Sequence, residues 1–358
     1  MLNNQRFSGG RPAHKRRRKK MTKSEFKSFI KSVPKAELHI HIEAVISLAG
    51  VKKMYKNRFG KEMTKEEQTA LFSYNDLNGF IQAFLKVQDL FVSEKDFNVV
   101  FKELEKYLVR NGIDYCEAFF APTAFLKKGF DYKKMVQIFH KQIARIKEKD
   151  GITIKLLMDV SRTFGCENAT KNYELLKKYP CEDIIGIGLG GAEAKGPAKE
   201  YEPVFQLAKK EGWRVVAHAG EDVGPESIWD SINCLGVERI GHGVTAYQDP
   251  KLIDQLIKTK LPIEICITSN TFTKKVVKMA RYHPVRKYYD QGIMVCINTD
   301  DPVFFKTTML DELWICVKSL NFTMDEIKQL IKNSYISSFM SDAEKKKALA
   351  AVDKAWKK

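Results

Sequence analysis

Short apolar runs rich in β-branched residues recur along the chain, and segments with helical periodicity separate most of them. Eight runs are present: Ala36–Glu43, Gly112–Pro122, Ile152–Ser161, Ile184–Gly191, Arg214–Glu221, Glu238–Val244, Pro262–Asn270 and Ile293–Pro302. Runs of this kind are typical of parallel strands that are buried on both faces. Strands that alternate with helices indicate a parallel sheet. We therefore predict a (β/α)₈ TIM barrel, with a doubly wound open sheet as the competing architecture.

The segment between the first two predicted strands, residues 45–110, is far longer than one connecting helix requires. Phe80, Phe84 and Leu85 lie in helical register within it. We predict extra helices over the C-terminal mouth of the barrel, because insertions after strands are where barrel enzymes build their pockets. The three apolar residues are candidates for a lid, and the core-facing side of an amphipathic helix would carry the same pattern.

The composition suits a folded chain with a sizeable core, because 44% of the 358 residues are hydrophobic and 29% are charged. These values exclude a wholly disordered chain. No segment approaches the ~18 consecutive apolar residues that a membrane-spanning helix needs. The seven cysteines are scattered and form no Cys-x-x-Cys pair. This argues against a disulfide framework or a zinc ribbon and favours a reducing compartment, the cytoplasm.

The formal net charge of +17 is concentrated near the N-terminus. Residues 1–20 contain eight basic residues, six of them consecutive at 15–20, and no acidic residue, which leaves +9 for the rest. We expect a disordered basic tail at 1–20 ahead of a single domain at 21–358, and Met21 is an alternative start. A basic tail can bind nucleic acid. Because no aromatic and basic surface is apparent beyond the tail, we expect neither a specific nucleic-acid partner nor a membrane partner.

Side chains of the kinds that bind metals occur at the C-terminal ends of the predicted strands. His39 and His41 are two residues apart on the first strand, so strand alternation points both to the same face. The others end the fifth, sixth and eighth strands: His218, His242, Asp300 and Asp301. Taken singly, a histidine in a strand is more often a hydrogen-bonded core residue than a ligand, and Asp-Asp-Pro is more often a turn or a helix cap. Together they converge on one barrel mouth, and imidazole with carboxylate but no thiolate favours a catalytic zinc site.

Five motifs together resemble the adenosine deaminase family of the amidohydrolase superfamily. In chain order they are Pro34–Ile42 (PKAELHIHI), Val216–Glu221 (VAHAGE), Arg239–Gly243 (RIGHG), Ser269–Asn270 and Asn298–Pro302 (NTDDP). The match extends to about Phe339 and so covers nearly all of the chain outside the tail. The resemblance implies a hydrolytic aminopurine deaminase of the EC 3.5.4 class that holds one zinc ion per subunit and acts on a small-molecule purine.

The resemblance also implies a role for each matched residue. Glu221 corresponds to the glutamate that protonates purine N1, and His242 to the histidine that orients the attacking hydroxide. Asp301 corresponds to the aspartate that hydrogen-bonds the hydroxide and purine N7. Gly191 corresponds to the glycine whose backbone N–H meets purine N3. The implied zinc ligands are His39, His41, His218 and Asp300.

The chemistry of deamination is consistent with these roles. Adding hydroxide to C6 breaks the aromaticity of the ring, so a ring nitrogen must gain a proton as the carbon is attacked. Glu221 lies three residues beyond His218, where a strand gives way to a loop. Its useful form is the protonated acid, which burial favours by raising the pKa. Asp301 is expected to stay ionised through the charge of the metal.

One position departs from the family pattern and leaves the substrate open. Adenosine-specific members continue the first-strand motif with Asp-Gly, and that aspartate holds the ribose 5′-hydroxyl, whereas this chain has Glu43 and Ala44. Adenine-specific members carry His-Ile-Glu, so Glu43 favours adenine or a modified nucleoside, whereas Ala44 fits neither pattern. We predict that Glu43 contacts the substrate, and that adenosine and 2′-deoxyadenosine are deaminated, adenosine giving inosine plus ammonia.

Other substrates remain as alternatives. Adenine is the second choice, and modified nucleosides such as aminofutalosine or N6-substituted AMP are also open. A metal-dependent hydrolase of esters or lactones on the same barrel is a further alternative, which the intact Glu221 and Asp301 disfavour. The oligomeric state is not predicted by any feature of the sequence.

Overall fold

Eight parallel strands form the centre of the molecule, side by side in chain order. The computed structural model describes residues 21–74 and 77–357, so the basic tail predicted at 1–20 lies outside the described residues. Each strand overlaps one of the eight predicted runs. The strands are β1 (Lys35–Glu37), β2 (Ile113–Phe120), β3 (Thr153–Asp159), β4 (Ile184–Leu189), β5 (Arg214–Ala219), β6 (Arg239–His242), β7 (Ile263–Ile265) and β8 (Val295–Ile297).

The sheet closes between its first and last strands. Just beyond β1, Ile40 pairs in parallel with Asp300, which follows β8. The backbone N–H of His41 donates to the carbonyl oxygen of Asp300 at 3.0 Å, and the N–H of Asp300 donates to the carbonyl oxygen of His39 at 3.0 Å. A doubly wound sheet would leave β1 and β8 apart, so these bonds confirm the predicted (β/α)₈ barrel.

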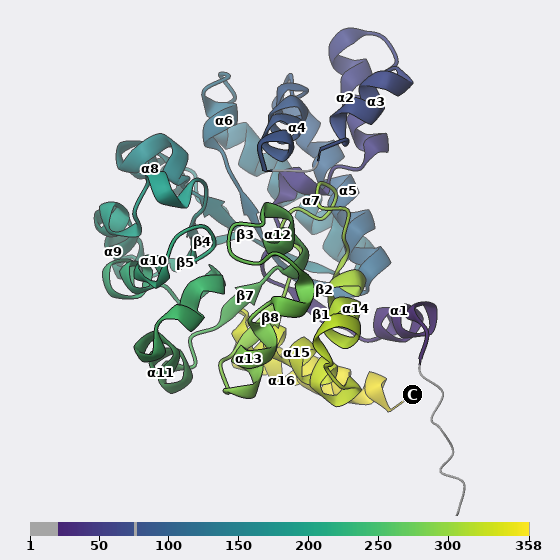
Figure 1. The fold of residues 1–358 in the computed structure, drawn as a ribbon. Coiled ribbons are helices and arrows are strands. Elements are labelled where there is room, and N and C mark those ends of the chain that lie inside the picture. Colours follow the sequence, from purple (N-terminus) through teal and green to yellow (C-terminus); the bar gives the residue numbers. More distant parts are fainter. Residues whose placement is uncertain (1–20, 75–76, 358) are drawn as a thin grey trace, which may run out of the picture.

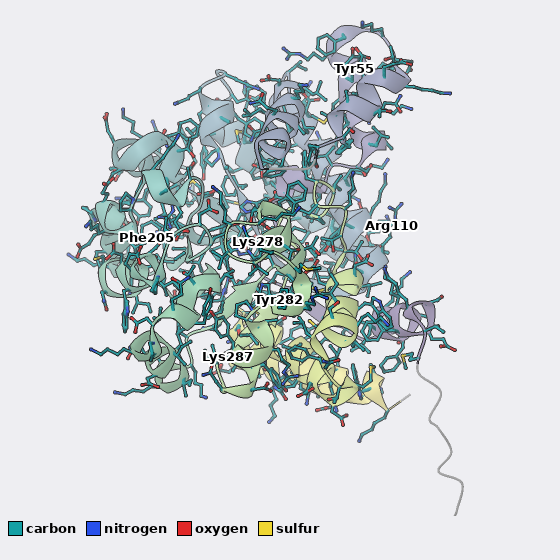
Figure 2. All side chains as sticks on the ribbon, in the orientation of Figure 1. Tyr55, Arg110, Phe205, Lys278, Tyr282 and Lys287 are labelled. Atoms are coloured by element: carbon teal, nitrogen blue, oxygen red, sulfur yellow. The ribbon has the colours of Figure 1, made fainter. Side chains whose placement is uncertain are left out.

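Helices surround the barrel and bury an apolar face against it (Figure 1). Phe205, labelled in Figure 2 among the outer helices, is fully buried, which shows how completely the inner helix faces are covered. Capping boxes with threonine or serine at the N-cap set the starts of α1, α3, α15 and α16. The helices outside the first connection are α1 (Lys23–Ser32), α6 (Thr123–Leu126), α7 (Tyr132–Asp150), α8 (Gly165–Lys178), α9 (Glu202–Lys210), α10 (Pro225–Asp230), α11 (Pro250–Thr259), α12 (Ile267–Thr273), α13 (Val285–Asp290), α14 (Met309–Leu320), α15 (Met324–Ser337) and α16 (Asp342–Trp356).

The long connection between β1 and β2 forms extra helices, as predicted. They are α2 (Leu48–Phe59), α3 (Lys65–Leu71), α4 (Leu77–Asp89) and α5 (Phe97–Asn111), and in Figure 1 the first three stand together at the top of the view. The rings of Phe80 and Phe84 in α4 lie 5.6 and 5.4 Å from the ring of Phe304. Phe304 follows β8, so α4 lies at the C-terminal end of the barrel. Leu85 is 47% exposed and takes no part in this contact.

Two further expectations about the chain can be compared with the structure. All seven cysteines have free thiols, in agreement with the absence of a disulfide framework. None of the helices in the described part of the chain combines the length and the hydropathy that crossing a bilayer requires.

Candidate active site at the C-terminal end of the barrel

Three histidines and one aspartate meet where the strands end. His39 and His41 follow β1, His218 lies in β5 and Asp300 follows β8. One donor atom from each residue lies within 4.8 Å of the other three. The Nε2 atoms of His41 and His218 are 3.3 Å apart, and Asp300 Oδ1 is 3.3 Å from His41 Nε2. The fold therefore brings together the four side chains expected to bind a metal, although they come from distant parts of the sequence.

The donor set fits a divalent metal ion. His39 Nε2 is buried and has no hydrogen-bond partner among the described residues; the nearest carboxylate oxygen, Asp300 Oδ1, is 3.4 Å away. A cation between these atoms would satisfy all of them at once. Three imidazoles and one carboxylate without a thiolate are typical of catalytic zinc sites. The residues present are thus suited to hold zinc.

A surrounding layer of buried polar side chains orients the cluster. Glu264 of β7 accepts a hydrogen bond from His39 Nδ1 at 2.7 Å, which leaves Nε2 directed into the cluster. Ser269 of α12 donates to Asp300 Oδ2 at 2.7 Å. Arg239 of β6 is fully buried and donates to Glu264 through Nε. These contacts hold the ligand atoms in place before any ion arrives.

Charges within the cluster shift the pKa values of its members. Burial opposes the ionisation of Asp300, but hydrogen bonds from His39 and His41 hold the pKa of this carboxyl well below its usual range. Burial also opposes protonation of the two histidines, but Asp300 raises the pKa of His39 to about 9 and that of His41 to about 10. Burial lowers the pKa of His218 well below its usual value. A metal ion must therefore displace protons from this cluster.

Glu221 lies in the loop that follows β5, with Oε2 3.5 Å from His242 Nε2. Burial, followed by the neighbouring carboxylates of Asp300 and Asp222, raises the pKa of Glu221 well above its usual value. The surroundings of Glu221 therefore favour the protonated form of its carboxyl group. This is the state that a proton donor to a substrate requires.

A chain of hydrogen bonds fixes which ring nitrogen of His242 carries the proton. The backbone N–H of Val285 donates to His283 Nδ1 at 3.2 Å, so the proton of His283 lies on Nε2, which donates to Asn270 Oδ1 at 3.1 Å. The amide nitrogen of Asn270 then donates to His242 Nδ1 at 3.1 Å. Burial lowers the pKa of both histidines to about 3, so both rings are neutral. The network therefore places the proton of His242 on Nε2, the atom that faces Glu221.

The loop that carries Glu221 is anchored by Glu193, a residue that sequence reasoning missed. The Glu193 carboxylate accepts hydrogen bonds from the four consecutive backbone N–H groups of residues 220–223, at 2.5, 3.0, 2.8 and 3.3 Å. The hydroxyl of Ser227 donates to it as well. Glu193 lies two residues beyond Gly191, so it ties the loop after β4 to the loop after β5. A single glutamate after a glycine-rich strand end gives no signal for this role.

A second pair of buried carboxylates, Glu43 and Asp159, lies on the β1 and β3 side of the site. Glu43 Oε1 accepts a hydrogen bond from the backbone N–H of Ala121 at 3.0 Å. Asp159 Oδ1 accepts two backbone hydrogen bonds, including that of Gly190 at 2.9 Å. Burial raises the pKa of Glu43 to about 7 and also raises that of Asp159, while the charge of His41 acts in the opposite direction on both. Asp159 was not predicted, although it is the polar residue that ends the third strand.

Gly191 and Asp301 complete the predicted set. Gly191 has a φ of 97°, and a Cβ atom at this position would lie 2.8 Å from Thr163 Oγ1, so the backbone here requires glycine. Burial and the adjacent Asp300 carboxylate raise the pKa of Asp301 to about 8. The expected ionised state of Asp301 therefore depends on the charge of a bound metal, because the protein's own groups favour the protonated form. The structure places all nine predicted residues at the same end of the barrel: His39, His41, Glu43, Gly191, His218, Glu221, His242, Asp300 and Asp301.

Comparison with known proteins establishes the family. The sequence model of the adenosine deaminase family matches residues 34–355. The chain belongs to the adenosine deaminase family. It is accordingly a hydrolytic deaminase of adenine-type substrates, on the barrel that members of the amidohydrolase superfamily share.

Similar members of the adenosine deaminase family carry different substrate names. The aminodeoxyfutalosine deaminase of Streptomyces avermitilis is 31% identical over 336 residues, which cover 93% of this chain and 94% of that protein. The adenosine deaminase of Clostridium kluyveri is 32% identical over 324 residues, 87% of this chain and 91% of that protein. The crystal structure of adenine deaminase from Arthrobacter aurescens superposes with a TM-score of 0.85 at 28% identity, covering 91% of this chain and 100% of that one. Family membership therefore defines the reaction, and the substrate must be inferred from the site.

Proposed function

We propose that this protein deaminates adenosine and 2′-deoxyadenosine, giving inosine or 2′-deoxyinosine and ammonia, and that His39, His41, His218 and Asp300 hold one zinc ion per chain. One observation carries the proposal: the carboxyl group of Glu221, whose pKa burial raises, lies 3.5 Å from His242 Nε2, at the edge of the metal-type cluster. Hydrolytic deamination needs a proton donor to the ring and a donor to the incoming oxygen, and these two side chains supply both. The free thiols of the chain are in keeping with a cytoplasmic enzyme.

A zinc ion at the four ligands would supply a water molecule that is acidic enough to react at neutral pH. Glu221 gives its carboxyl proton to purine N1 as the water oxygen adds to C6. The Nε2–H of His242 donates a hydrogen bond to that oxygen and stabilises the charge that develops on it. The proton on N1 stays in the hypoxanthine ring. Of the two protons of the water, one leaves on the amino nitrogen as part of ammonia, and the other returns the Glu221 carboxylate to its protonated form, so that C6 keeps a carbonyl oxygen. Breaking the C6–N6 bond then releases ammonia and restores aromaticity.

Two further groups orient the purine. The backbone N–H of Gly191 is expected to meet N3, because the conformation of this residue leaves no side chain between the backbone and the ring. Asp301 is expected to hydrogen-bond N7, an atom that can only accept. This bond requires the protonated form of Asp301, which burial and the Asp300 carboxylate favour and which the charge of a bound metal would oppose.

Glu43 and Asp159 favour a nucleoside over a free base. Both carboxylates are buried, and each has acceptor capacity beyond the backbone N–H groups that it holds. Ribose hydroxyls can donate to these oxygens, whereas adenine has no hydroxyl group. An unmatched buried acceptor costs about 1–3 kcal/mol, so a site built around hydroxyl donors discriminates against the free base. The same pair of acidic groups disfavours a phosphorylated nucleoside by charge repulsion.

Adenine is the second candidate substrate, because Glu43 occupies the position where adenosine-specific members carry aspartate and because the chain is also similar to adenine deaminases. A modified nucleoside such as aminodeoxyfutalosine is the third. In both cases the roles of Glu221 and His242 are unchanged, since the reaction at C6 is the same.

The test is ultraviolet-monitored deamination by the zinc-loaded protein, with adenosine, 2′-deoxyadenosine, adenine, aminodeoxyfutalosine and N6-methyl-AMP assayed side by side. We expect the two unmodified nucleosides to have the highest kcat/KM. Turnover of adenine alone would overturn the nucleoside assignment and make Glu43 a marker of adenine specificity. A strong preference for aminodeoxyfutalosine or N6-methyl-AMP would overturn it equally.

A further inference from the structure

A second group of side chains that can bind a metal lies outside the candidate active site. His140 belongs to α7, and Cys181 and Asp183 belong to the connection between α8 and β4. One donor atom from each lies within 4.8 Å of the other two. His140 Nδ1 is 2.8 Å and Cys181 Sγ is 4.0 Å from the same oxygen, Asp183 Oδ2. We propose that these three residues, the peripheral cluster, bind a zinc ion.

The distances within the peripheral cluster are close to those around tetrahedral zinc. Bonds of about 2.3 Å to sulfur and about 2.0–2.1 Å to nitrogen or oxygen place neighbouring donor atoms about 3.3–3.6 Å apart. The His140–Asp183 pair at 2.8 Å is slightly closer than this, and the Cys181–Asp183 pair at 4.0 Å is slightly wider. Side-chain shifts of roughly half an ångström are enough to reach zinc geometry. A mixed set of thiolate, imidazole and carboxylate suits zinc better than magnesium or calcium.

The barrel itself holds two of the three donors in position. The backbone N–H of Ile184 donates to the carbonyl oxygen of Cys181 at 3.0 Å, which closes a turn over the two ligands. The carbonyl oxygen of Asp183 accepts from the N–H of Leu156 in β3 at 2.7 Å. Asp183 Oδ1 is 3.5 Å from Lys155 Nζ, so Oδ2 is the oxygen left to face His140. Binding here would require little ordering of the chain.

The peripheral cluster is open to solvent on one side. A surface cavity of about 330 Å³ is lined by His140, Cys181 and Glu182, together with Val136, Gln137 and Pro180. Glu182 Oε1 is 3.8 Å from His140 Nδ1, and this side chain is 78% exposed and free to reorient. Glu182 can therefore become the fourth ligand, or leave that position to water.

This cluster lies at the end of the barrel opposite to the active site. Asp183 directly precedes β4, whereas Gly191 follows it, and the six residues of β4 span roughly 20 Å. An ion held here joins α7 to the connection that enters β4 and takes no part in deamination. Because it binds only the folded chain, it raises thermal stability in proportion to the logarithm of its concentration. This inference does not depend on which purine the enzyme accepts.

Cobalt(II) titration of the metal-depleted full-length protein tests the proposal. A cysteine thiolate bound to cobalt gives a charge-transfer band in the near ultraviolet, and the donor set of the active site contains no cysteine. We expect two cobalt ions per chain and this band in the wild type. Cys181→Ser should lose the band and one of the two ions, and keep its deaminase activity. His140→Gln should have the same effect, although it leaves the thiol in place.

Cys234→Ser is the matched control, because Cys234 is also a partly exposed free thiol and lies in no metal-type group of the described residues. This variant should keep both ions and the band. One ion per chain without a charge-transfer band in the wild type would overturn the proposal, and so would a band that persists in Cys181→Ser. If the wild-type protein has no deaminase activity, the proposed function is wrong. The cobalt titration would still test the peripheral cluster, because it does not depend on that activity.

Discussion

Glu221 is the residue on which the proposed chemistry depends most, because its proton must be on the carboxyl group when the substrate binds. Glu221→Gln keeps the shape of the side chain and removes the transferable proton. We expect kcat/KM for adenosine to fall by roughly 10²–10⁴-fold while the zinc content stays the same. The exposed Glu226, five residues further on, offers the control Glu226→Gln, which should retain activity. A Glu221→Gln enzyme as fast as the wild type would exclude Glu221 as the proton donor.

Asn270 determines the position of the proton on His242, and reversing its hydrogen bond should therefore disable the enzyme without unfolding it. In Asn270→Asp an acceptor faces His242 Nδ1 in place of a donor, so the ring proton moves to Nδ1 and leaves Nε2. We expect kcat to fall by roughly 10²–10⁴-fold with little change in KM, as for other catalytic histidines held in the wrong tautomer. The measurement is steady-state kinetics together with the melting temperature.

The control for this change is Asn98→Asp, because Asn98 is exposed in α5 and its side chain bonds only near the surface. It should leave kcat unchanged. If Asn270→Asp also retained the wild-type kcat, the tautomer of His242 would not matter for the reaction.

Glu193 positions the Glu221 loop through both of its carboxylate oxygens. Glu193→Gln leaves one oxygen acceptor for backbone N–H groups that now use two. We expect kcat/KM to fall by up to about 10²-fold, because small displacements of a catalytic group have effects of this size. Kinetics of Glu193→Gln should be compared with Glu200→Gln, an exposed glutamate in the same connection. Equal activities would show that the loop keeps its shape without the carboxylate.

The candidate site residues were easier to find from the sequence than the residues that hold them in place. His39 and Asp301 stand out because they are polar residues at the ends of apolar strands. Glu264 and Glu193 do not, because their roles arise from partners that are distant in the sequence: Glu264 bonds His39 across 225 residues and Glu193 bonds Glu221 across 28. No local pattern encodes such a pair.

At the scale of elements, the positions of the strands were predictable and their lengths were not. All eight runs contain strands because both faces of each strand are buried, which requires continuous apolar sequence. The run Pro262–Asn270 contains only the three-residue β7, and α12 begins at Ile267. The β-branched residues Ile267 and Thr268 favour a strand, but here the tertiary setting outweighs that preference. The helical turn brings Ser269 and Asn270 to the active site.

Lys35 connects β1 to the end of α5 and makes the stability of this junction depend on pH. Its buried ammonium group donates to the carbonyl oxygens of Val33 and Asn111 at 2.7 Å each, and of Gly112 at 3.2 Å. Burial lowers the pKa of Lys35 from 10.5 to about 7. Between these pH values the unfolded chain binds one more proton than the folded chain. The contribution of Lys35 to the free energy of unfolding therefore increases as pH rises from about 7 to 10.5.

Lys35→Met should remove this dependence. We expect the wild type to gain stability relative to the variant at each step of pH between about 7 and 10, measured by urea unfolding at matched ionic strength. The exposed Lys31 provides the control, and Lys31→Met should show the same pH dependence of the free energy of unfolding as the wild type. A difference between Lys35→Met and wild type that stays constant with pH would show that Lys35 titrates outside this range.

At the scale of the whole molecule, the candidate metal ligands span the place where the barrel closes. His39 and His41 follow the first strand and Asp300 follows the last, and both strands are only three residues long. Removing the metal with a chelator should therefore lower the melting temperature and increase hydrogen exchange in β1 and β8 more than in β3 and β4. Hydrogen-exchange mass spectrometry before and after re-addition of zinc is the measurement. A uniform increase over all eight strands would contradict a local role at the closure.

The closure of the barrel also determines the point during translation at which the chain can form its active structure. Leu38, just after β1, donates its backbone N–H to Asn298 Oδ1 at 2.8 Å across 260 residues of sequence. A ribosome adds about 5–20 residues per second, so roughly 13–50 s pass between the appearance of β1 and that of its partner β8. During this interval His39 and His41 are present without Asp300, and the first strand has one unpaired edge. A nascent chain that stops before β8 therefore has neither a closed barrel nor the complete set of candidate metal ligands, and we expect deaminase activity only near the end of translation.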